Sequence, residues 1–194
     1  DAVEQIIAQT RLRLAGVMPE SKTRRVSLFD GDARPIRKGS LAKPTQFGYT
    51  GQVTDNPDGI VLDYELEAGI PPDGPRLGPA IERIIAAVGA TPDAVTADRG
   101  YGLASVDTQL EDLGVDLVAI PRKGQPGAAR RDAQSEDRFV ELVKWRTGSE
   151  GRIATLKRQH GWERARNRGL EGARIWCGWG VLSHNLVKIA GLTH

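Results

Sequence analysis

Two strand-like runs joined by a tight turn place the strongest constraint on the fold of this chain. The runs "FGYTGQVTD" and "GIVLDYELEAG" are rich in β-branched and aromatic residues, and "NPDG" stands where they meet. An Asp-Gly pair between two such runs is a strong signal for a β-hairpin. We therefore expect an antiparallel strand pair over residues 47–69.

Alternating strand and helix patterns follow the hairpin. "PAIERIIAAVG", "LASVDTQLEDLGV", residues 137–158 and "GARIWCGWGVLSHNLVKIAGL" favour helices, whereas "DAVTADRGYG" and "DLVAIPRKG" favour strands. We also expect a strand in "TRRVSLFDGD" before the hairpin, and a polar loop over residues 125–137. The order β-β-β-α-β-α-β-α-α predicts an α/β fold, a mixed sheet with helices on both faces. The ribonuclease H-like fold has this order.

The length and composition suit one cytosolic globular domain. The chain has 194 residues, 39% of them hydrophobic, and Cys177 is its single cysteine, which excludes an internal disulfide. No apolar run approaches the roughly 18 residues that span a bilayer, so we expect no membrane partner. The chain begins with Asp1, inside a helical pattern. We expect a fragment, with residues 1–20 as the end of an upstream region and residues 21–194 as the domain.

Charges are segregated along the chain. Residues 22–43 hold seven Lys or Arg against two Asp, and residues 141–168 hold eight against three Glu. Residues 50–120 hold thirteen acids against three Arg. If the two basic stretches meet in space, they form a surface suited to a phosphate backbone. Two solvated basic faces are the alternative interpretation.

Two acids stand where expected strands end. Asp30 follows "RRVSLF" and Asp98 follows "AVTA", the position where α/β sheets place ligand groups. Carboxylates from separate elements can hold Mg²⁺ ions that stabilise an in-line phosphoryl displacement. Asp32 competes with Asp30 as the first ligand, and we prefer Asp30 because it directly ends the apolar run. Both acids could instead cap turns, where Asp is common.

A third acid, Glu150, lies within the basic stretch "KWRTGSEGRIATLKR". On a helix, Arg146 at i−4 and Lys157 at i+7 share its face. Cations beside a metal-bound carboxylate would meet DNA phosphates near the cleaved bond. The alternative is one solvated acid that balances its basic neighbours.

The motifs in this order resemble the catalytic domain of DDE transposases encoded by bacterial insertion sequences. They are "SLFDGDARPI", "FGYTGQV", "VTADRGYG", "IPRKG" and "KWRTGSEGRIATLKRQHGW", followed by "GVLSHNLVKIA". The pattern Arg-x₃-Glu-x₆-Lys at Arg146, Glu150 and Lys157 is similar to the family pattern around its third acid. The family pattern usually begins with a Tyr where this chain has Val143.

The resemblance implies a DDE triad of Asp30, Asp98 and Glu150 that binds two Mg²⁺ or Mn²⁺ ions. Its partners would be transposon-end and target DNA, with a homo-oligomer on DNA in the bacterial cytoplasm. The basic residues that we expect at the DNA are Arg122, Lys123, Arg146, Arg152, Lys157 and Arg158. The resemblance implies strand cleavage and strand transfer at the ends of the element. Two alternatives remain: a metal-dependent nuclease of this fold without strand transfer, and a catalytically silent DNA-binding remnant or regulator.

Overall fold

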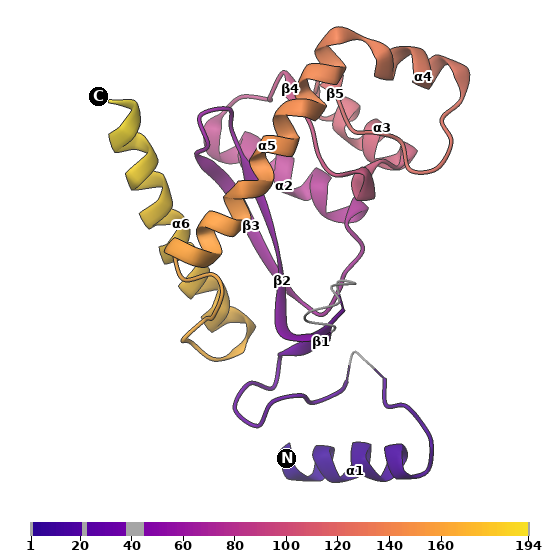
Figure 1. Ribbon diagram of the computed structural model, residues 1–194, viewed down its shortest axis with the longest axis vertical. Helices are drawn as coiled ribbons and strands as arrows, with labels where there is room; N and C mark the ends of the chain where they lie inside the picture. Colours follow the sequence, from indigo (N-terminus) through magenta and orange to yellow (C-terminus); the bar gives the residue numbers. More distant parts are fainter. Residues whose placement is uncertain (1, 21–22, 38–44, 194) are drawn as a thin grey trace. The chain divides into compact units, whose positions relative to one another are not determined.

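The computed structural model describes residues 2–20, 23–37 and 45–193, except for the side chains of residues 148–150. The chain forms two compact units (Figure 1). Unit 1 consists of Asp1–Val53, Tyr64–Pro71 and Leu156–His194, and unit 2 of Thr54–Asp63 and Pro72–Thr155. Helices and small sheets make up a mixed α/β protein, as the sequence predicts.

The hairpin forms where the sequence predicts it. Strand β2 (Gln46–Asp55) and strand β3 (Val61–Ala68) are neighbours in a three-stranded sheet of order β1-β2-β3. Asn56 closes the turn between them, because its backbone N–H donates to the Ile60 carbonyl at 3.0 Å. Its side-chain oxygen accepts the Ile60 N–H at 2.9 Å. The short strand β1 (Arg34–Ile36) pairs antiparallel with β2, with Arg34 opposite Gly48.

The strand predicted in "TRRVSLFDGD" is wrong. The residues described there form no strand, and the first strand begins only at Arg34. The Ser27 hydroxyl accepts the N–H groups of Phe29 at 3.2 Å and Asp30 at 3.1 Å. The Asp30 carboxylate then accepts those of Asp32 and Ala33 at 3.1 Å and 3.2 Å. Side-chain oxygens thus accept the backbone N–H groups that would otherwise donate to a neighbouring strand.

Unit 2 contains a parallel strand pair packed with two helices. Strand β4 (Ala94–Val95) pairs with β5 (Leu117–Val118), Val95 standing opposite Val118. Helix α2 (Gly74–Val88) precedes β4, and α3 (Ala104–Asp112) connects β4 to β5, as predicted. Their apolar faces bury one core, formed by Leu77, Ile81, Ile84, Val95, Val106, Leu110, Val115, Val118 and Ile120.

The single mixed sheet predicted from the sequence is not found among the described residues. They form a three-stranded and a two-stranded sheet instead. The missing strand before Asp30 removes one element of the expected sheet. Strands β4 and β5 span two residues each, and Pro121, which has no N–H to donate, follows β5 closely.

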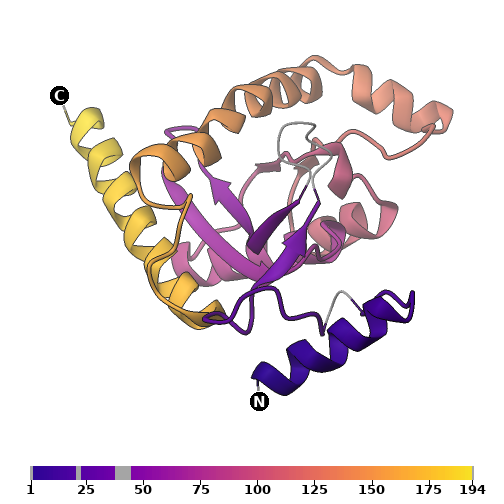
Figure 2. The same ribbon diagram turned by 60° about the horizontal axis from the view of Figure 1, so that its bottom comes forward.

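Two helices occupy residues 128–159, and Figure 2 shows them in succession. Helix α5 (Asp137–Gln159) confirms the long helix predicted over residues 137–158 and passes through Gly148 and Gly151 without a break. The polar loop predicted over residues 125–137 is wrong, because α4 (Ala128–Ser135) forms there. Arg130 anchors α4, since its guanidinium donates to the Ile120 carbonyl at 3.0 Å and lies 5.6 Å from the centre of the Phe139 ring.

Helix α6 (Gly169–Leu192) packs one face into unit 1. Cys177 lies in a small core with Leu66 and Ala173, and burial raises the pKa of its thiol to about 11. Trp162 packs beside this core and donates its indole N–H to the Cys177 carbonyl at 2.9 Å. A Cβ at Gly180 would overlap the His160 carbonyl, so only glycine allows this close packing.

Helix α1 (Ala2–Leu14) confirms the N-terminal helix predicted from the sequence. It has no buried residue. Amide side chains attach it instead: Gln5 donates to the Thr23 carbonyl at 2.7 Å, and Gln9 exchanges two hydrogen bonds with the backbone of Arg25. Among the described residues, no helix is long and apolar enough to span a membrane.

Candidate functional site: two acids and a cationic helix

The loops that follow β4 and β5 lie side by side in unit 2. Asp98 stands at the start of the short helix η1 (Arg99–Tyr101), three residues after β4. Arg99 donates to the carbonyls of Arg122 at 3.1 Å and Gly124 at 2.9 Å, and the Lys123 N–H donates to the Gly102 carbonyl at 2.8 Å. These bonds fix Asp98 and the "PRKG" loop at the carboxyl ends of the parallel strands, where α/β proteins place their ligands.

Gly102 makes this contact between the loops possible. A Cβ at this position would overlap the Pro121 carbonyl oxygen and approach the Lys123 nitrogen to 3.0 Å. Any other residue would therefore separate the loops. The structure thus gives "DRGYG" a reason for its second glycine that the sequence alone did not supply.

Asp98 forms an ion pair with Arg146 of α5. The Arg146 Nη1 lies 2.8 Å from the Asp98 Oδ1. The Arg146 side chain is 20% exposed, whereas the Asp98 side chain is 64% exposed. The carboxylate therefore has a fixed cation beside it and an open side toward solvent. The ion pair brings together two residues that the sequence predicts in one site.

Glu150 follows Arg146 by one helical turn on α5. Its backbone is helical, which agrees with the prediction that the two positions share one face. The Glu150 side chain lies outside the described residues, so its role as the third acid stays a prediction. Beyond it on α5, Lys157 and Arg158 are exposed.

Asp30 belongs to unit 1 and lies in a polar turn. The Tyr49 hydroxyl of β2 lies 2.7 Å and 2.8 Å from its two carboxylate oxygens. Burial, followed by the hydrogen bond to Asp30, raises the pKa of Tyr49, so the phenol stays protonated and donates. Sequence reasoning missed Tyr49, since nothing in "FGYTG" indicates which turn its side chain meets.

Asp32, the competitor of Asp30, has a structural role in unit 1. Its Oδ2 accepts the Leu170 N–H at 3.0 Å, at the first turn of α6. A carboxylate at this position accepts a helix N–H that has no partner within the helix. The positive end of the helix dipole also stabilises its negative charge. This contact supports our preference for Asp30, although Asp30 itself also caps a turn.

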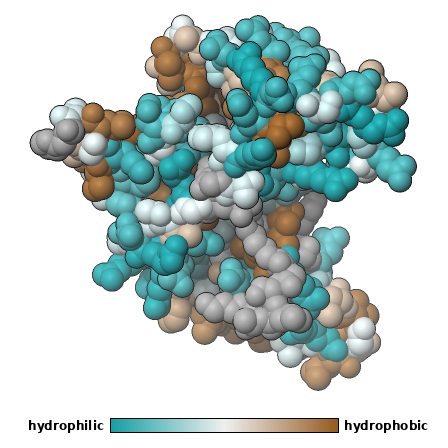
Figure 3. Space-filling model, turned by 45° about the horizontal axis from the view of Figure 1, so that its top comes forward, coloured by the Kyte–Doolittle hydropathy of each residue, from teal (hydrophilic) through white to brown (hydrophobic). Residues whose placement is uncertain are grey.

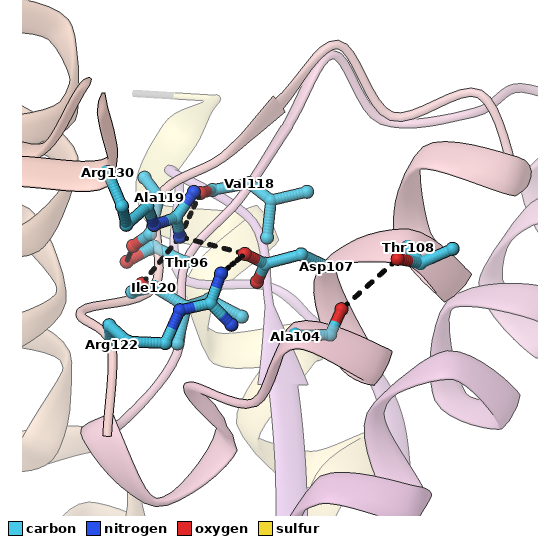
Figure 4. A network of polar contacts seen from close by, with 9 residues as sticks. All are labelled: Thr96, Ala104, Asp107, Thr108, Val118, Ala119, Ile120, Arg122 and Arg130. Carbon is cyan, nitrogen blue, oxygen red and sulfur yellow. Dashed lines mark hydrogen bonds and ion pairs between the residues drawn. The ribbon is translucent and has the colours of Figure 1, made fainter. Parts of the chain in front are cut away.

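Besides Arg146, two more of the predicted DNA-contacting arginines have internal acidic partners. The Arg122 Nη2 lies 2.7 Å from the Oδ2 of Asp107, and Arg130 approaches the same oxygen at 3.1 Å (Figure 4). The Asp107 side chain is only 7% exposed, so this cluster ties α3 to the segment after β5. Arg152 pairs with Asp55, and both side chains are largely buried. Lys123, in contrast, is exposed. For Arg122 and Arg152 the structure therefore offers a stabilising role beside the predicted one.

The donor set suits hard divalent cations. Carboxylate oxygens are the protein ligands that Mg²⁺ and Mn²⁺ prefer. Among the described residues there is no cluster of three His, Cys, Asp or Glu side chains that could hold a metal. Asp30 and Asp98 belong to different units, and the Glu150 side chain lies outside that set. The chemistry of the three acids fits the metal, and their convergence stays a prediction.

Unit 2 also contains a cavity of about 610 Å³. The tip of the hairpin, β4 and α5 line it, and Trp145 contributes a half-buried indole to its wall. Arg138 and Glu141 add charge at its rim. Trp145 thus immediately precedes the arginine that pairs with Asp98, on the same helix.

A family model described as the transposase DDE domain matches residues 21–186 of the chain. The matched range contains all three predicted acids and all six predicted DNA-contacting residues. No curated protein matches the chain. No solved structure matches it either.

Proposed function

The chain belongs to the transposase DDE domain family, and on this premise we propose that it is the catalytic domain of an insertion-sequence transposase with a ribonuclease H-like fold. The ion pair between Asp98 and Arg146 is the observation that carries the proposal. It joins the acid that follows β4 to the arginine of the Arg-x₃-Glu-x₆-Lys pattern. The hairpin followed by alternating strands and helices supports the fold.

Asp30, Asp98 and Glu150 would hold two Mg²⁺ or Mn²⁺ ions. Bound metal supplies Lewis-acid stabilisation of the attacking and leaving oxygens in such displacements. The Tyr49 hydroxyl holds the carboxylate of Asp30 in one orientation, and the Arg146 guanidinium does so for Asp98.

The proposed reaction has two displacement steps at phosphorus. Water attacks a phosphodiester at the end of the element, the bond from phosphorus to the 3′-oxygen breaks, and a free 3′-hydroxyl is left. That hydroxyl then attacks a phosphodiester of the target, whose own 3′-oxygen leaves. The enzyme forms no covalent intermediate, so its residues act by positioning the DNA and stabilising charge.

The exposed cations would bind the DNA backbone. Lys157 and Arg158 lie exposed near the end of α5, and Lys123 lies exposed beside the Asp98 loop. Arg146 would add positive charge beside the DNA backbone while its guanidinium holds Asp98. Arg122 and Arg152 would act mainly by supporting the site through Asp107 and Asp55.

Cleavage and strand transfer with matched donor and target DNA test this function. We expect Mg²⁺-dependent nicking and joined products from the wild-type chain, and neither from Asp98→Asn or Glu150→Gln. Asp116→Asn is the matched control, since Asp116 is an exposed acid at the opposite end of β5.

The outcomes of this assay separate the alternatives. Nicking without joined products would identify a nuclease that transfers nothing. DNA binding without nicking would identify a silent remnant or regulator. Full activity of Asp98→Asn and Glu150→Gln would refute the assignment of the triad.

A further inference from the structure

Unit 1 contains a pocket of about 620 Å³, formed by α1, the segment that follows it and the start of the three-stranded sheet. Four arginines line it: Arg13 of α1, Arg24, Arg25, and Arg37 directly after β1. Among the described residues that line it, none is an acid. We call this cavity the arginine pocket. Hydrophilic residues cover most of the face drawn in Figure 3, so a surface arginine alone indicates no site. Four arginines around one cavity do.

Arg24 and Arg25 are half-buried, and backbone carbonyls rather than carboxylates accept from their guanidinium groups. The Arg24 Nη2 donates to the Pro19 carbonyl at 2.5 Å, and the Arg25 Nη2 donates to the Leu28 carbonyl at 3.1 Å. The Nε atoms of both are buried and have no hydrogen-bond partner in the described part of the chain. Removing a charge from water is costly unless an opposite charge accompanies it. The two side chains therefore favour an anion in the pocket.

The number of cations indicates how much negative charge the pocket suits. A guanidinium presents a planar set of donors that matches phosphate oxygens, and such bonds are among the strongest hydrogen bonds in proteins. One phosphate monoester carries a charge of about −1.5 to −2 at pH 7. Four arginines exceed what one phosphate neutralises, so they favour a chain of two or three phosphates.

The remaining wall of the arginine pocket is apolar. Met18, Phe47 and Ile70 line it, and their side chains are 67%, 64% and 58% exposed. An exposed aromatic ring offers a flat surface on which a second ring can stack. The pocket therefore suits a ligand with a polyanionic end and a flat, apolar end.

We propose that the arginine pocket binds a nucleoside di- or triphosphate. The phosphate chain contacts the arginines, and the base lies against Phe47. The volume falls within the range of about 300–1,000 Å³ that is usual for small-molecule sites. The proposal does not depend on the catalytic function, because none of Asp30, Asp98 and Glu150 lines this pocket.

The depth of the arginines favours a small ligand over a nucleic-acid backbone. A duplex presents its phosphates along a convex surface, which suits exposed cations. Arg24 and Arg25 are instead half-buried in the wall of a cavity, where an isolated phosphate chain can enter. An acidic peptide is less suitable, because its carboxylates carry one charge each and are spread along a chain.

A bound nucleotide would hold α1 in place. This helix has no buried residue, and Gln5 and Gln9 attach it through hydrogen bonds to the segment that contains Arg25. Arg13 lies on α1, whereas Arg37 and Phe47 belong to the sheet region. A ligand that contacts all three would connect the helix to the sheet. The arginine pocket thus provides a ligand-dependent attachment of α1.

Isothermal titration calorimetry of the 194-residue chain with ADP, at low salt and with EDTA, tests the proposal. We expect saturable binding of one ADP with a Kd of about 1–100 µM. Arg24→Gln and Arg25→Gln should weaken it about tenfold or more. Arg13→Gln and Arg37→Gln should weaken it about threefold or more, and both side chains are exposed, so these variants should fold normally. Arg11→Gln is the matched control, because Arg11 is exposed on α1 outside the pocket.

A variant of Phe47 separates the base from the phosphates. Phe47→Ala should weaken ADP about tenfold, the usual effect of removing a stacked aromatic ring, and should leave the affinity for inorganic tripolyphosphate unchanged. Phe29→Ala is the control, because Phe29 is 74% exposed in the same unit and does not line the pocket.

Backbone hydrogen exchange gives an independent measurement. Without ligand, the amides of residues 2–14 should exchange fast, because no residue of α1 is buried. Saturating ADP should slow their exchange in the wild type and in Arg11→Gln, and should slow it less in Arg37→Gln.

Four results would overturn the proposal. Absence of saturable ADP binding below about 1 mM would show that the pocket is no nucleotide site. Equal weakening by Arg11→Gln and Arg13→Gln would indicate a diffuse basic surface. Unchanged ADP affinity in Phe47→Ala would show that the base is not bound there. Displacement of ADP by a short DNA duplex at equal phosphate concentration would assign the arginines to a nucleic-acid backbone.

Discussion

The Nη1 of Arg146 lies 2.8 Å from the Oδ1 of Asp98, and this contact joins helix α5 to the loop after strand β4. The two residues are 48 positions apart in the sequence. One is the acid that ends an apolar run, and the other begins the Arg-x₃-Glu-x₆-Lys pattern. Their contact places the second predicted acid beside Arg146, which precedes Glu150 by one helical turn on α5.

Replacing Arg146 should reduce catalysis far more than stability. We expect Arg146→Ala to lower Mg²⁺-dependent cleavage about 100-fold, the usual cost of removing a preorganised charged donor. Arg146→Lys should recover part of the activity, because a lysine restores the charge without the planar pair of donors. Single-turnover cleavage of an end-containing duplex provides the measurement.

The control for Arg146 is its effect on folding. An ion pair with a largely exposed acid contributes about 0–1 kcal/mol, so urea unfolding of Arg146→Ala should stay within that range of the wild type. A large loss of stability with unchanged cleavage per folded molecule would contradict the role that we assign.

Removing Asp107 should destabilise unit 2 strongly. The substitution Asp107→Ala would leave the guanidinium groups of Arg122 and Arg130 without their shared, 7% exposed partner. Loss of one member of a buried ion pair costs about 3 kcal/mol or more. Urea denaturation followed by circular dichroism measures this loss. Asp112→Ala, at an exposed position of the same helix, should change stability by less than about 0.5 kcal/mol.

The substitution Gly102→Ala should separate the two loops of the site. The added methyl group would overlap the Pro121 carbonyl oxygen, which belongs to the backbone and cannot rotate away. We expect a loss of about 2 kcal/mol in stability, since overpacking costs 1–3 kcal/mol, together with lower cleavage. At Gly127 a Cβ would meet nothing within 4 Å, so Gly127→Ala should be neutral in both assays.

The sequence predicted the elements that depend on local chemistry. The hairpin, helices α2, α3 and α5 and the strand before Asp98 lie where periodicity and turn residues place them. It failed at residues 24–30, where the side chains of Ser27 and Asp30 accept the backbone N–H groups of residues two and three positions later in place of a strand neighbour. It also failed at α4, where Arg130 ties a polar segment to the Ile120 carbonyl. In both places a side-chain contact selects the backbone conformation, and the residue types alone do not predict which conformation forms.

The candidate site was predictable in its residues but not in its contacts. The position of Asp98 after a strand and the helical spacing of Arg146 and Glu150 were visible in the sequence. The partners Tyr49 of Asp30, Asp107 of Arg122 and Asp55 of Arg152 were not, since each depends on contacts between distant segments. A basic residue that bonds an internal acid has the same sequence pattern as one that meets DNA.

His160 should make folding stability depend on pH. Burial, and next the neighbouring His184, lower the pKa of His160, whose Nδ1 lies 3.1 Å from the Ser183 hydroxyl oxygen. The folded state thus favours the neutral ring, so this contribution is complete above the ordinary pKa of about 6.5. It is lost as the pH falls through the lower pKa of the folded state. Urea unfolding at pH 7.5 and 5.5 should show a smaller pH effect in His160→Gln than in the wild type, and an equal effect would contradict this assignment.

Titration of Mn²⁺ into the wild type, Asp98→Asn and Asp116→Asn tests the central claim most directly. Calorimetry on the 194-residue chain detects binding without DNA or turnover. The account predicts saturable binding by the wild type and Asp116→Asn, and affinity weakened about tenfold or more in Asp98→Asn, since a neutral amide is a poorer ligand than a carboxylate. Equal affinity of Asp98→Asn and the wild type would contradict the claim that Asp98 belongs to a metal-binding catalytic site.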